Sequence, residues 1–137
     1  MGVGAGVMLP ASRNEVRVLA DRINRHRATL GCPTLRWDER LAAVARRHSQ
    51  DMAKRRFFDH TNPDGRDPFD RLRSAGIRYR AAAENIAFGR TSGRDTYDDW
   101  IESDGHRRNI ENCEYTSFGI GLYDRRWTLV IARYEDP

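Results

Sequence analysis

The sequence has no long apolar segment, a single lysine and few cysteines, and each scarcity removes a class of protein. No apolar run approaches the roughly 18 residues that a membrane-spanning helix requires, so we expect no transmembrane segment. Hydrophobic residues make up 39% and charged residues 32% of the 137 residues, a balance typical of a globular chain. This length fits one domain with one core, and it favours a single functional site.

Basic residues outnumber acidic ones only slightly, 24 against 20, and Lys54 is the only one that is not arginine. Acidic residues lie among the arginines through most of the chain, a pattern typical of solvated helix faces of mixed charge. We therefore expect no nucleic-acid partner. The segment from Arg71 to Arg80 is locally basic, and it fits either solvated arginines around a helix end or contact with an anionic surface.

Familiar catalytic motifs are also missing. The sequence contains no G-x-S-x-G, H-E-x-x-H, Walker or G-x-G-x-x-G stretch. Serine-hydrolase, P-loop and dinucleotide-binding functions are therefore set aside.

The two cysteines, Cys32 and Cys113, each lie beside turn-forming residues. Neither belongs to a C-x-x-C unit or lies beside a histidine. Their spacing alone leaves one disulfide, two free thiols or half of a metal site open. A disulfide would close a long loop, contribute about 4 kcal/mol of stability, and indicate an oxidising compartment.

The first eleven residues are not assigned to the domain. The stretch MGVGAGVMLP has no basic region and only a weakly apolar run, so it is not a complete export signal. We interpret residues 1–11 as a disordered segment, as the remnant of a trimmed signal, or as residues added by cloning. Residues 12–137 form the single predicted domain.

Hydrophobic periodicity predicts helices that precede and alternate with strands. The pair Ser12 and Glu15 forms a capping-box pattern, and Asp38 is placed to cap a second helix. We predict helices at 13–29, 38–55, 68–75 and 95–103, a strand at 82–88, and a hairpin of strands 117–123 and 127–134. This order predicts an α+β domain with helices packed on an antiparallel sheet.

Two of the four histidines are candidates for chemistry. His60 and His106 each lie in a segment dense in Gly, Asp and Asn, which we expect to be a structured turn that presents the side chain. Loop histidines commonly bind metals or carry protons. His26 and His48 lie within predicted helices, and we interpret both as structural.

Glu84 is the third candidate, because it lies in the otherwise apolar strand AAAENIAFG. A carboxylate there is costly unless it faces a cleft or a partner. It can orient an imidazole, complete a metal site, or pair with one of the many arginines.

An ordered series of short motifs covers the chain from about Val16 to Tyr134. The stretches are LRWD at 35–38, AxxHSxDM at 45–52, FFDHTNPDGR at 57–66, ENIA at 84–87, Trp100, GHRxNI at 105–110 and FGIG at 118–121. This series resembles the CAP superfamily (cysteine-rich secretory proteins, antigen 5 and pathogenesis-related 1 proteins), also called SCP domains, and within it the bacterial secreted branch.

The resemblance implies a three-layer α-β-α sandwich with a central antiparallel sheet. Three members of the family's cleft tetrad map onto His60, Glu84 and His106, and the fourth, often a glutamate, falls on Ser103 with Glu102 adjacent. Ala83 and Asp104 depart from the family pattern, which usually has glycine and proline there. Cys32 and Cys113 match the positions of two cysteines in some bacterial relatives. The resemblance therefore implies a Cys32–Cys113 disulfide in this chain.

Three functions follow from this resemblance. The first is a secreted, monomeric binding module in which His60, His106 and Glu84 hold a divalent ion, with Zn²⁺ the best suited, and a lipid, glycan or protein partner occupies the groove. The second is a metal-dependent peptidase or cell-wall hydrolase, although Ser103 removes the carboxylate that would act as general base. The third is a structural network with function elsewhere on the surface. Histidine ligation predicts that metal affinity falls below about pH 6.

Overall fold

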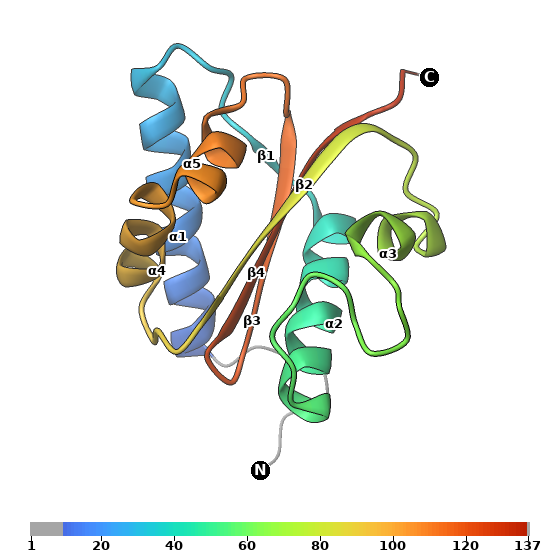
Figure 1. Cartoon of the computed structure of the whole chain (residues 1–137). Helices are drawn as coiled ribbons and strands as arrows, with labels where there is room; N and C mark the ends of the chain where they lie inside the picture. Colours follow the sequence, from blue (N-terminus) through green and yellow to red (C-terminus); the bar gives the residue numbers. More distant parts are fainter. Residues whose placement is uncertain (1–9, 137) are drawn as a thin grey trace.

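The computed structural model describes residues 10–136, which form a sheet between two layers of helices (Figure 1). One face is covered by α1 (Pro10–Thr29), α4 (Gly93–Ile101) and α5 (Asp104–Glu111). The other face is covered by α2 (Glu39–Arg55) and α3 (Pro68–Ser74). The strands between them are β1 (Arg36–Trp37), β2 (Tyr79–Phe88), β3 (Ser117–Tyr123) and β4 (Arg126–Tyr134). The predicted α+β class and the α-β-α sandwich are confirmed.

The four strands lie in the order β1-β3-β4-β2. Strands β3 and β4 form the predicted hairpin, and β2 pairs antiparallel with β4, a strand order that the sequence could not predict. Strand β1 pairs with β3 in parallel, so the sheet is mixed. Two residues are too few to show the alternation that marks a strand in a sequence, which is why β1 was not predicted. The order leaves β2 at one edge of the sheet, and this edge carries the candidate site.

The sheet separates two hydrophobic clusters because successive side chains of a strand point to opposite faces. On the side of α1, Leu129 and Ile131 of β4 pack with Trp100. On the side of α2, Val130 of β4 packs with Leu41. Glu84 is the register partner of Val130, so its side chain emerges on the face covered by α2 and α3.

Helix α2 approaches β3 closely where two glycines lie. A Cβ atom on Gly119 would overlap the backbone of Ala42, and one on Gly121 would overlap the backbone of Arg46. Only glycine permits this distance between helix and strand. Asp38 caps the same helix as predicted, since its side chain accepts from the backbone amides of Arg40 and Leu41.

Two predictions about helices were wrong. Helix α1 begins at Pro10 rather than at residue 13, so the first turn extends into the segment assigned to 1–11; residues 1–9 lie outside the described range. The predicted Ser12–Glu15 capping box is not formed there. Glu15 instead accepts a hydrogen bond of 2.9 Å from the backbone amide of Gly93, tying α1 to α4.

The polar stretch around His106 is helix α5 and not the predicted turn. Ser103 occupies the N-cap position with an extended backbone, and Asp104 supplies a negative charge in the first turn. The helix was not predicted because its residues are mostly polar and Ile110 is its one buried residue, so it shows no apolar periodicity.

The Cys32–Cys113 disulfide is confirmed and links residues 81 positions apart. It joins the loop after α1 to the loop after α5. Within residues 10–136, no helix combines the length and the apolar character needed to cross a bilayer.

Arg27, which the sequence did not single out, is completely buried beside this disulfide region. Its guanidinium donates five hydrogen bonds of 2.8–3.0 Å to backbone carbonyls. The acceptors are Pro33, Ile110, Asn112 and Tyr115. One side chain therefore fastens the end of α1 to the end of α5 and to the segment before β3.

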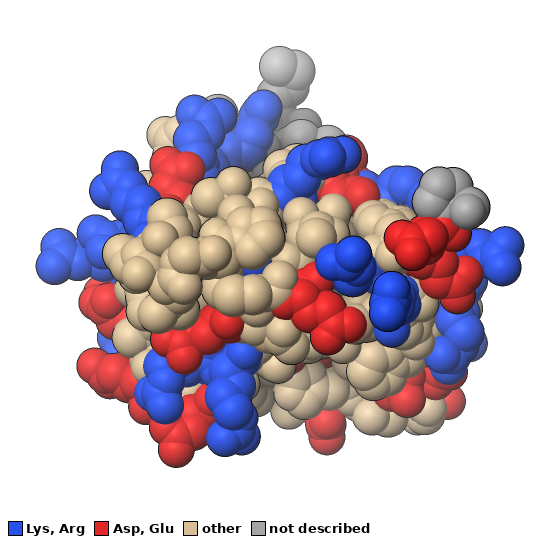
Figure 2. All heavy atoms as spheres, turned by 90° about the horizontal axis from the view of Figure 1, so that it is seen from above, with Lys and Arg blue, Asp and Glu red and all other residues tan. Residues whose placement is uncertain are grey.

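The face of the molecule seen from above shows basic and acidic groups interspersed around a central area of other residues (Figure 2). The locally basic segment 71–80 is also mixed with acidic groups, because each of its four arginines lies within 4 Å of a carboxylate. The pairs are Arg71–Glu84, Arg73–Asp70, Arg78–Glu135 and Arg80–Asp136.

Candidate histidine–glutamate cleft

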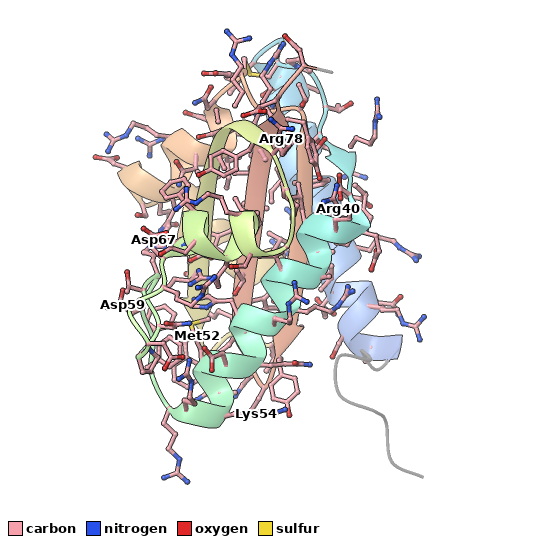
Figure 3. All side chains as sticks on the ribbon, turned by 90° about the vertical axis from the view of Figure 1, so that its right-hand side faces the viewer. Arg40, Met52, Lys54, Asp59, Asp67 and Arg78 are labelled. Carbon is pink, nitrogen blue, oxygen red and sulfur yellow. A yellow bond between two sulfur atoms is a disulfide. The ribbon has the colours of Figure 1, made fainter. Side chains whose placement is uncertain are left out.

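His60 lies in the loop between α2 and α3, next to Asp59 in the sequence, and Figure 3 labels Asp59 and Asp67 in this loop. The loop is held by its own short polar side chains, as the sequence predicted. Oδ1 of Asn62 accepts from the amides of Asp64 and Arg66, both at 3.0 Å, and Oδ1 of Asp59 accepts from the amide of Thr61 at 3.1 Å. Such turns fix the backbone and thereby position His60.

The structure brings His60 and Glu84 together. Nδ1 of His60 lies 2.8 Å from Oε1 of Glu84, whose side chain is only 2% exposed. Because a carboxylate can only accept, the His60 ring donates its Nδ1 proton. The other carboxylate oxygen accepts from Nη2 of Arg71 at 2.7 Å. Both oxygens of Glu84 are thus engaged by neighbouring side chains.

Arg71 also holds the loop directly. Its Nη1 donates to the backbone carbonyl of His60 at 2.8 Å. Arg71, Glu84 and His60 therefore form a closed set of contacts between α3, β2 and the loop. The pairing of Glu84 with an arginine and its orientation of an imidazole, which the sequence left as alternatives, both occur.

His48 of α2 completes the environment of the carboxylate from below the loop. Its Nε2 donates to the carbonyl of Asp59 at 2.9 Å and lies 3.8 Å from Oε1 of Glu84. Burial lowers the pKa of His48, and the negative charge of Glu84 opposes this only in part. Its hydrogen bond to the loop is consistent with the structural role that the sequence suggested.

His106 reaches the same edge of the sheet from the opposite face. Nδ2 of Asn85 donates to the backbone carbonyl of His106 at 3.1 Å, and Oδ1 of Asn85 accepts from Asn109 at 2.8 Å. The His106 ring lies 6.2 Å from the ring of Trp100, centroid to centroid. Glu84 and Asn85 are adjacent in β2, so their side chains point to opposite faces of the sheet. Glu84 orients the His60 ring on one face, and Asn85 holds the helix that carries His106 on the other.

The two cleft histidines have opposite pKa shifts. The hydrogen bond to Glu84 raises the pKa of His60, against a smaller opposing effect of burial. Burial lowers the pKa of His106, and the positive charge of protonated His60 lowers it further. His60 therefore holds a proton more tightly than His106, and the two imidazoles are near enough to sense each other's charge.

The chain also matches a known protein family. The model of the cysteine-rich secretory protein family, CAP, matches residues 20–129, which include all the cleft residues described above. The chain belongs to the CAP family.

Bacterial relatives share this CAP domain. The chain is 42% identical to the uncharacterized protein YkwD of Bacillus subtilis over 101 residues, 74% of this chain and 39% of that protein. A solved structure of an extracellular protein containing an SCP domain from Bacillus anthracis matches with a TM-score of 0.86 and 32% identity, over 93% of this chain and 45% of that one. The chain thus spans less than half of these relatives.

An outer surface protein of Borrelia burgdorferi has the same fold. Its solved structure matches with a TM-score of 0.83 at 19% identity, and the match covers 90% of this chain and 96% of that one.

The remaining cleft candidate, Ser103, lies at the N-cap of α5 in this CAP domain, but its side chain makes no capping hydrogen bond. The adjacent Glu102 is exposed to solvent. Within residues 10–136, no three His, Cys, Asp or Glu side chains are grouped as a set of metal ligands. His60 and Glu84 are in contact, and neither makes a hydrogen bond with His106 among these residues.

Sequence reasoning missed two residues of the cleft. Arg71 looked like one more solvated arginine, because nothing in a seven-residue helix shows which arginine turns inward. Asn85 had a signal, since an amide inside an apolar strand needs a partner as much as the neighbouring carboxylate does.

Proposed function

We propose that this CAP domain is an exported binding module that recognises its ligand at the cleft of His60, Glu84 and His106, with a divalent ion held by the two imidazoles. Support for export comes from the disulfide, which is typical of oxidising compartments. The relatives described as an extracellular protein and an outer surface protein support the same compartment.

The observation that carries the proposal is the 2.8 Å contact between Nδ1 of His60 and Oε1 of Glu84. Metal-binding histidines usually donate their second ring proton to a carboxylate or carbonyl, which fixes the tautomer and makes the ligating nitrogen more basic. Here the contact leaves Nε2 of His60 with the free lone pair, on a side chain that is 46% exposed.

Glu84 therefore supports the ion as an orienting residue and not as a ligand. Its oxygens are occupied by His60 and Arg71, so a direct bond to a metal would require breaking one of these contacts. This assignment changes the predicted ligand set from three residues to His60 and His106.

Zinc fits this donor set because imidazole nitrogen is among its preferred ligands. Two protein ligands leave an ion with open positions. A carboxylate, carbonyl or hydroxyl oxygen of the bound partner can occupy them, which makes recognition dependent on the ion. A protein or glycan ligand offers such oxygens.

Zinc titration calorimetry tests the proposal. His60→Ala and His106→Ala should each abolish measurable binding, and Glu84→Gln should weaken it about 10- to 100-fold, the usual effect of losing an orienting partner. His26→Ala is the matched control, because His26 pairs with Glu111 at 2.7 Å away from β2. Equal zinc affinity in the wild type and in His106→Ala would contradict the proposal.

The structural alternative has a specific observation in its favour, since Arg71, Glu84 and His60 also fix the loop. It predicts a lower melting temperature for Glu84→Gln with no zinc binding in any variant. A hydrolase would instead show turnover of a peptide or cell-wall substrate that is lost in both His60→Ala and His106→Ala.

A further inference from the structure

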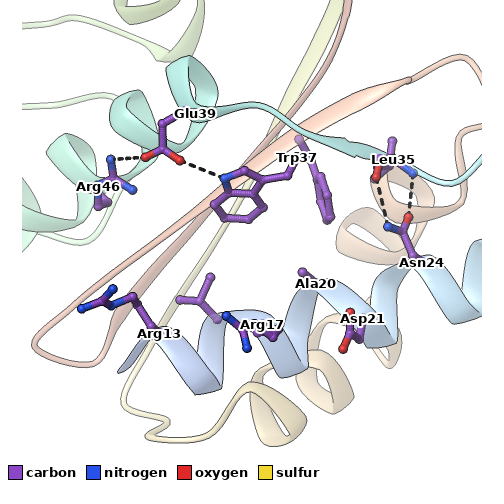
Figure 4. Close-up of a pocket in the computed structure, with 11 residues that line it drawn as sticks. Arg13, Arg17, Ala20, Asp21, Asn24, Leu35, Trp37, Glu39 and Arg46 are labelled. Carbon is purple, nitrogen blue, oxygen red and sulfur yellow. Dashed lines mark hydrogen bonds and ion pairs between the residues drawn. The ribbon is translucent and has the colours of Figure 1, made fainter. Parts of the chain in front are cut away.

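A hollow lies at the edge of the sheet opposite the one that carries His60, Glu84 and His106. It has a volume of about 640 Å³ and is bounded by α1, β1 and the first half of α2 (Figure 4). The strand order β1-β3-β4-β2 separates it from β2 by the width of the sheet. Strand β1 has only two residues, so the two helical layers are not closed over this edge. We call this hollow the β1 pocket.

The wall of the β1 pocket next to the core is apolar. Val16, Leu35 and Phe118 line it and are otherwise part of the hydrophobic core. Trp37 stands at its centre with 38% of its surface exposed. The indole packs edge-on against Phe118, with 5.7 Å between ring centroids, and its Nε1 donates to Glu39 at 3.0 Å. These two contacts fix the indole while much of it stays open to a ligand.

Two arginines of the β1 pocket have no side-chain partner among residues 10–136. Arg13 and Arg17 lie one turn apart on α1, and within residues 10–136 neither makes a hydrogen bond or an ion pair. Arg46 differs, because it pairs with Glu39 at 2.8 Å. Glu39 is therefore already compensated by Arg46 and by Trp37, and it does not neutralise the arginines of α1. Asp21 also lines the pocket, one turn of α1 after Arg17 (Figure 4), but the two side chains are not within ion-pair distance of each other.

We propose that the β1 pocket binds a small amphipathic organic anion with a flat apolar body. The body stacks on the open part of Trp37, since aromatic rings pair best with planar partners. The carboxylate, sulfonate or phosphate group meets Arg13 and Arg17, whose guanidinium groups form strong charge-assisted hydrogen bonds with oxyanions. A volume of about 640 Å³ lies within the range of pockets that hold molecules of this size.

Intrinsic fluorescence makes this site directly observable. Trp100 and Trp127 are buried, at 1% and 0% exposure, so Trp37 is the one of the three indoles that a ligand can reach. The probe is 8-anilinonaphthalene-1-sulfonate, a flat aromatic anion. It should quench Trp37 by contact and gain fluorescence on binding, and Trp37→Ala should reduce but not abolish the energy transfer, because buried Trp100 and Trp127 still transfer excitation to a bound dye.

The decisive comparison removes the positive charge from the protein in one experiment and the negative charge from the ligand in another. The double variant Arg13→Gln/Arg17→Gln should bind the sulfonate about tenfold more weakly. The double variant Arg25→Gln/Arg108→Gln is the matched control, because it loses the same charge from exposed residues outside the pocket and should bind like the wild type. The neutral analogue N-phenyl-1-naphthylamine should bind weakly to all three proteins.

Three results would overturn the proposal. Equal affinity of the sulfonate for both double variants would show that the arginines do not select an anion. If the wild type bound the neutral analogue as tightly as the sulfonate, the site would be hydrophobic and without charge preference. Binding to anionic phosphatidylglycerol vesicles without any binding of the free sulfonate would assign the arginines to a membrane surface.

His60→Ala should leave sulfonate binding unchanged, which separates this site from the cleft.

Discussion

Nη2 of Arg71 lies 2.7 Å from Oε2 of Glu84, and the carboxylate is buried while the arginine is partly buried, with side-chain exposures of 2% and 12%. The arginine compensates a carboxylate that would be costly in the core of an otherwise apolar strand. It also leaves the second carboxylate oxygen free to accept from His60. The contact between His60 and Glu84 therefore depends on Arg71 as well.

Replacing Arg71 by methionine should lower the free energy of unfolding by about 3 kcal/mol, because it leaves the Glu84 charge buried without its main partner. Denaturant unfolding followed by circular dichroism measures this loss. Arg73→Met is the control on the same helix, since Arg73 is 58% exposed and pairs with Asp70 at the surface. Its effect should stay below about 1 kcal/mol. Similar losses for both variants would contradict the assigned role of Arg71.

The cleft shows where sequence reasoning succeeds and where it ends. Composition identified Glu84 because burying a charge has a cost that can be read from its apolar neighbours. The helix around His106 was not predicted, because its polar residues resemble those of a turn and only Ile110 faces the core. Similarly, no local pattern shows that Arg71 rather than Arg73 turns inward. Strand order and the packing of α3 against β2 decide that, and both are long-range properties.

The two cleft histidines should titrate in a fixed order. The pKa of His60 is raised by its hydrogen bond to Glu84, whereas burial lowers the pKa of His106. NMR titration of the ring protons should therefore place His60 above, and His106 below, the ordinary histidine value of about 6.5. Glu84→Gln should bring the pKa of His60 down toward that value. Coincident titration of both rings would be inconsistent with the structure.

These shifts have opposite effects on stability. The stabilising contribution of protonated His60 is complete below about pH 6.5 and is lost as the pH rises through its raised pKa. The contributions of neutral His106 and His48 are present above about pH 6.5 and are lost as the pH falls through their lowered pKa values. A metal must displace the proton on His60, whose pKa is raised. As the pH is lowered, zinc affinity should therefore start to decrease while the pH is still above about 6.5, and not only below about pH 6.

Gly119 should not tolerate alanine. A Cβ at this position would overlap the backbone of Ala42, so α2 would have to move away from β3. We expect Gly119→Ala to lower the free energy of unfolding by about 2 kcal/mol, as overpacking of a close contact does. Gly105→Ala is a matched control, because nothing lies within 4 Å of a Cβ built there. Thermal melts should show a clear decrease for the first variant and a change within about 0.5 kcal/mol for the second.

Arg27 should be irreplaceable by lysine although the charge is conserved. Its guanidinium donates to four backbone carbonyls at once, at the junction of α1, α5 and the segment before β3. A lysine ammonium is a single point with three donors and cannot reproduce this planar fork. Carbonyls left buried without a donor cost about 1–3 kcal/mol each, so Arg27→Lys should lower the free energy of unfolding by at least about 3 kcal/mol. Arg25→Lys, at an exposed position of the same helix, should be neutral. The expected difference between the two variants in urea unfolding should persist with the Cys32–Cys113 disulfide intact, because the hydrogen bonds and the disulfide fasten neighbouring segments by independent means.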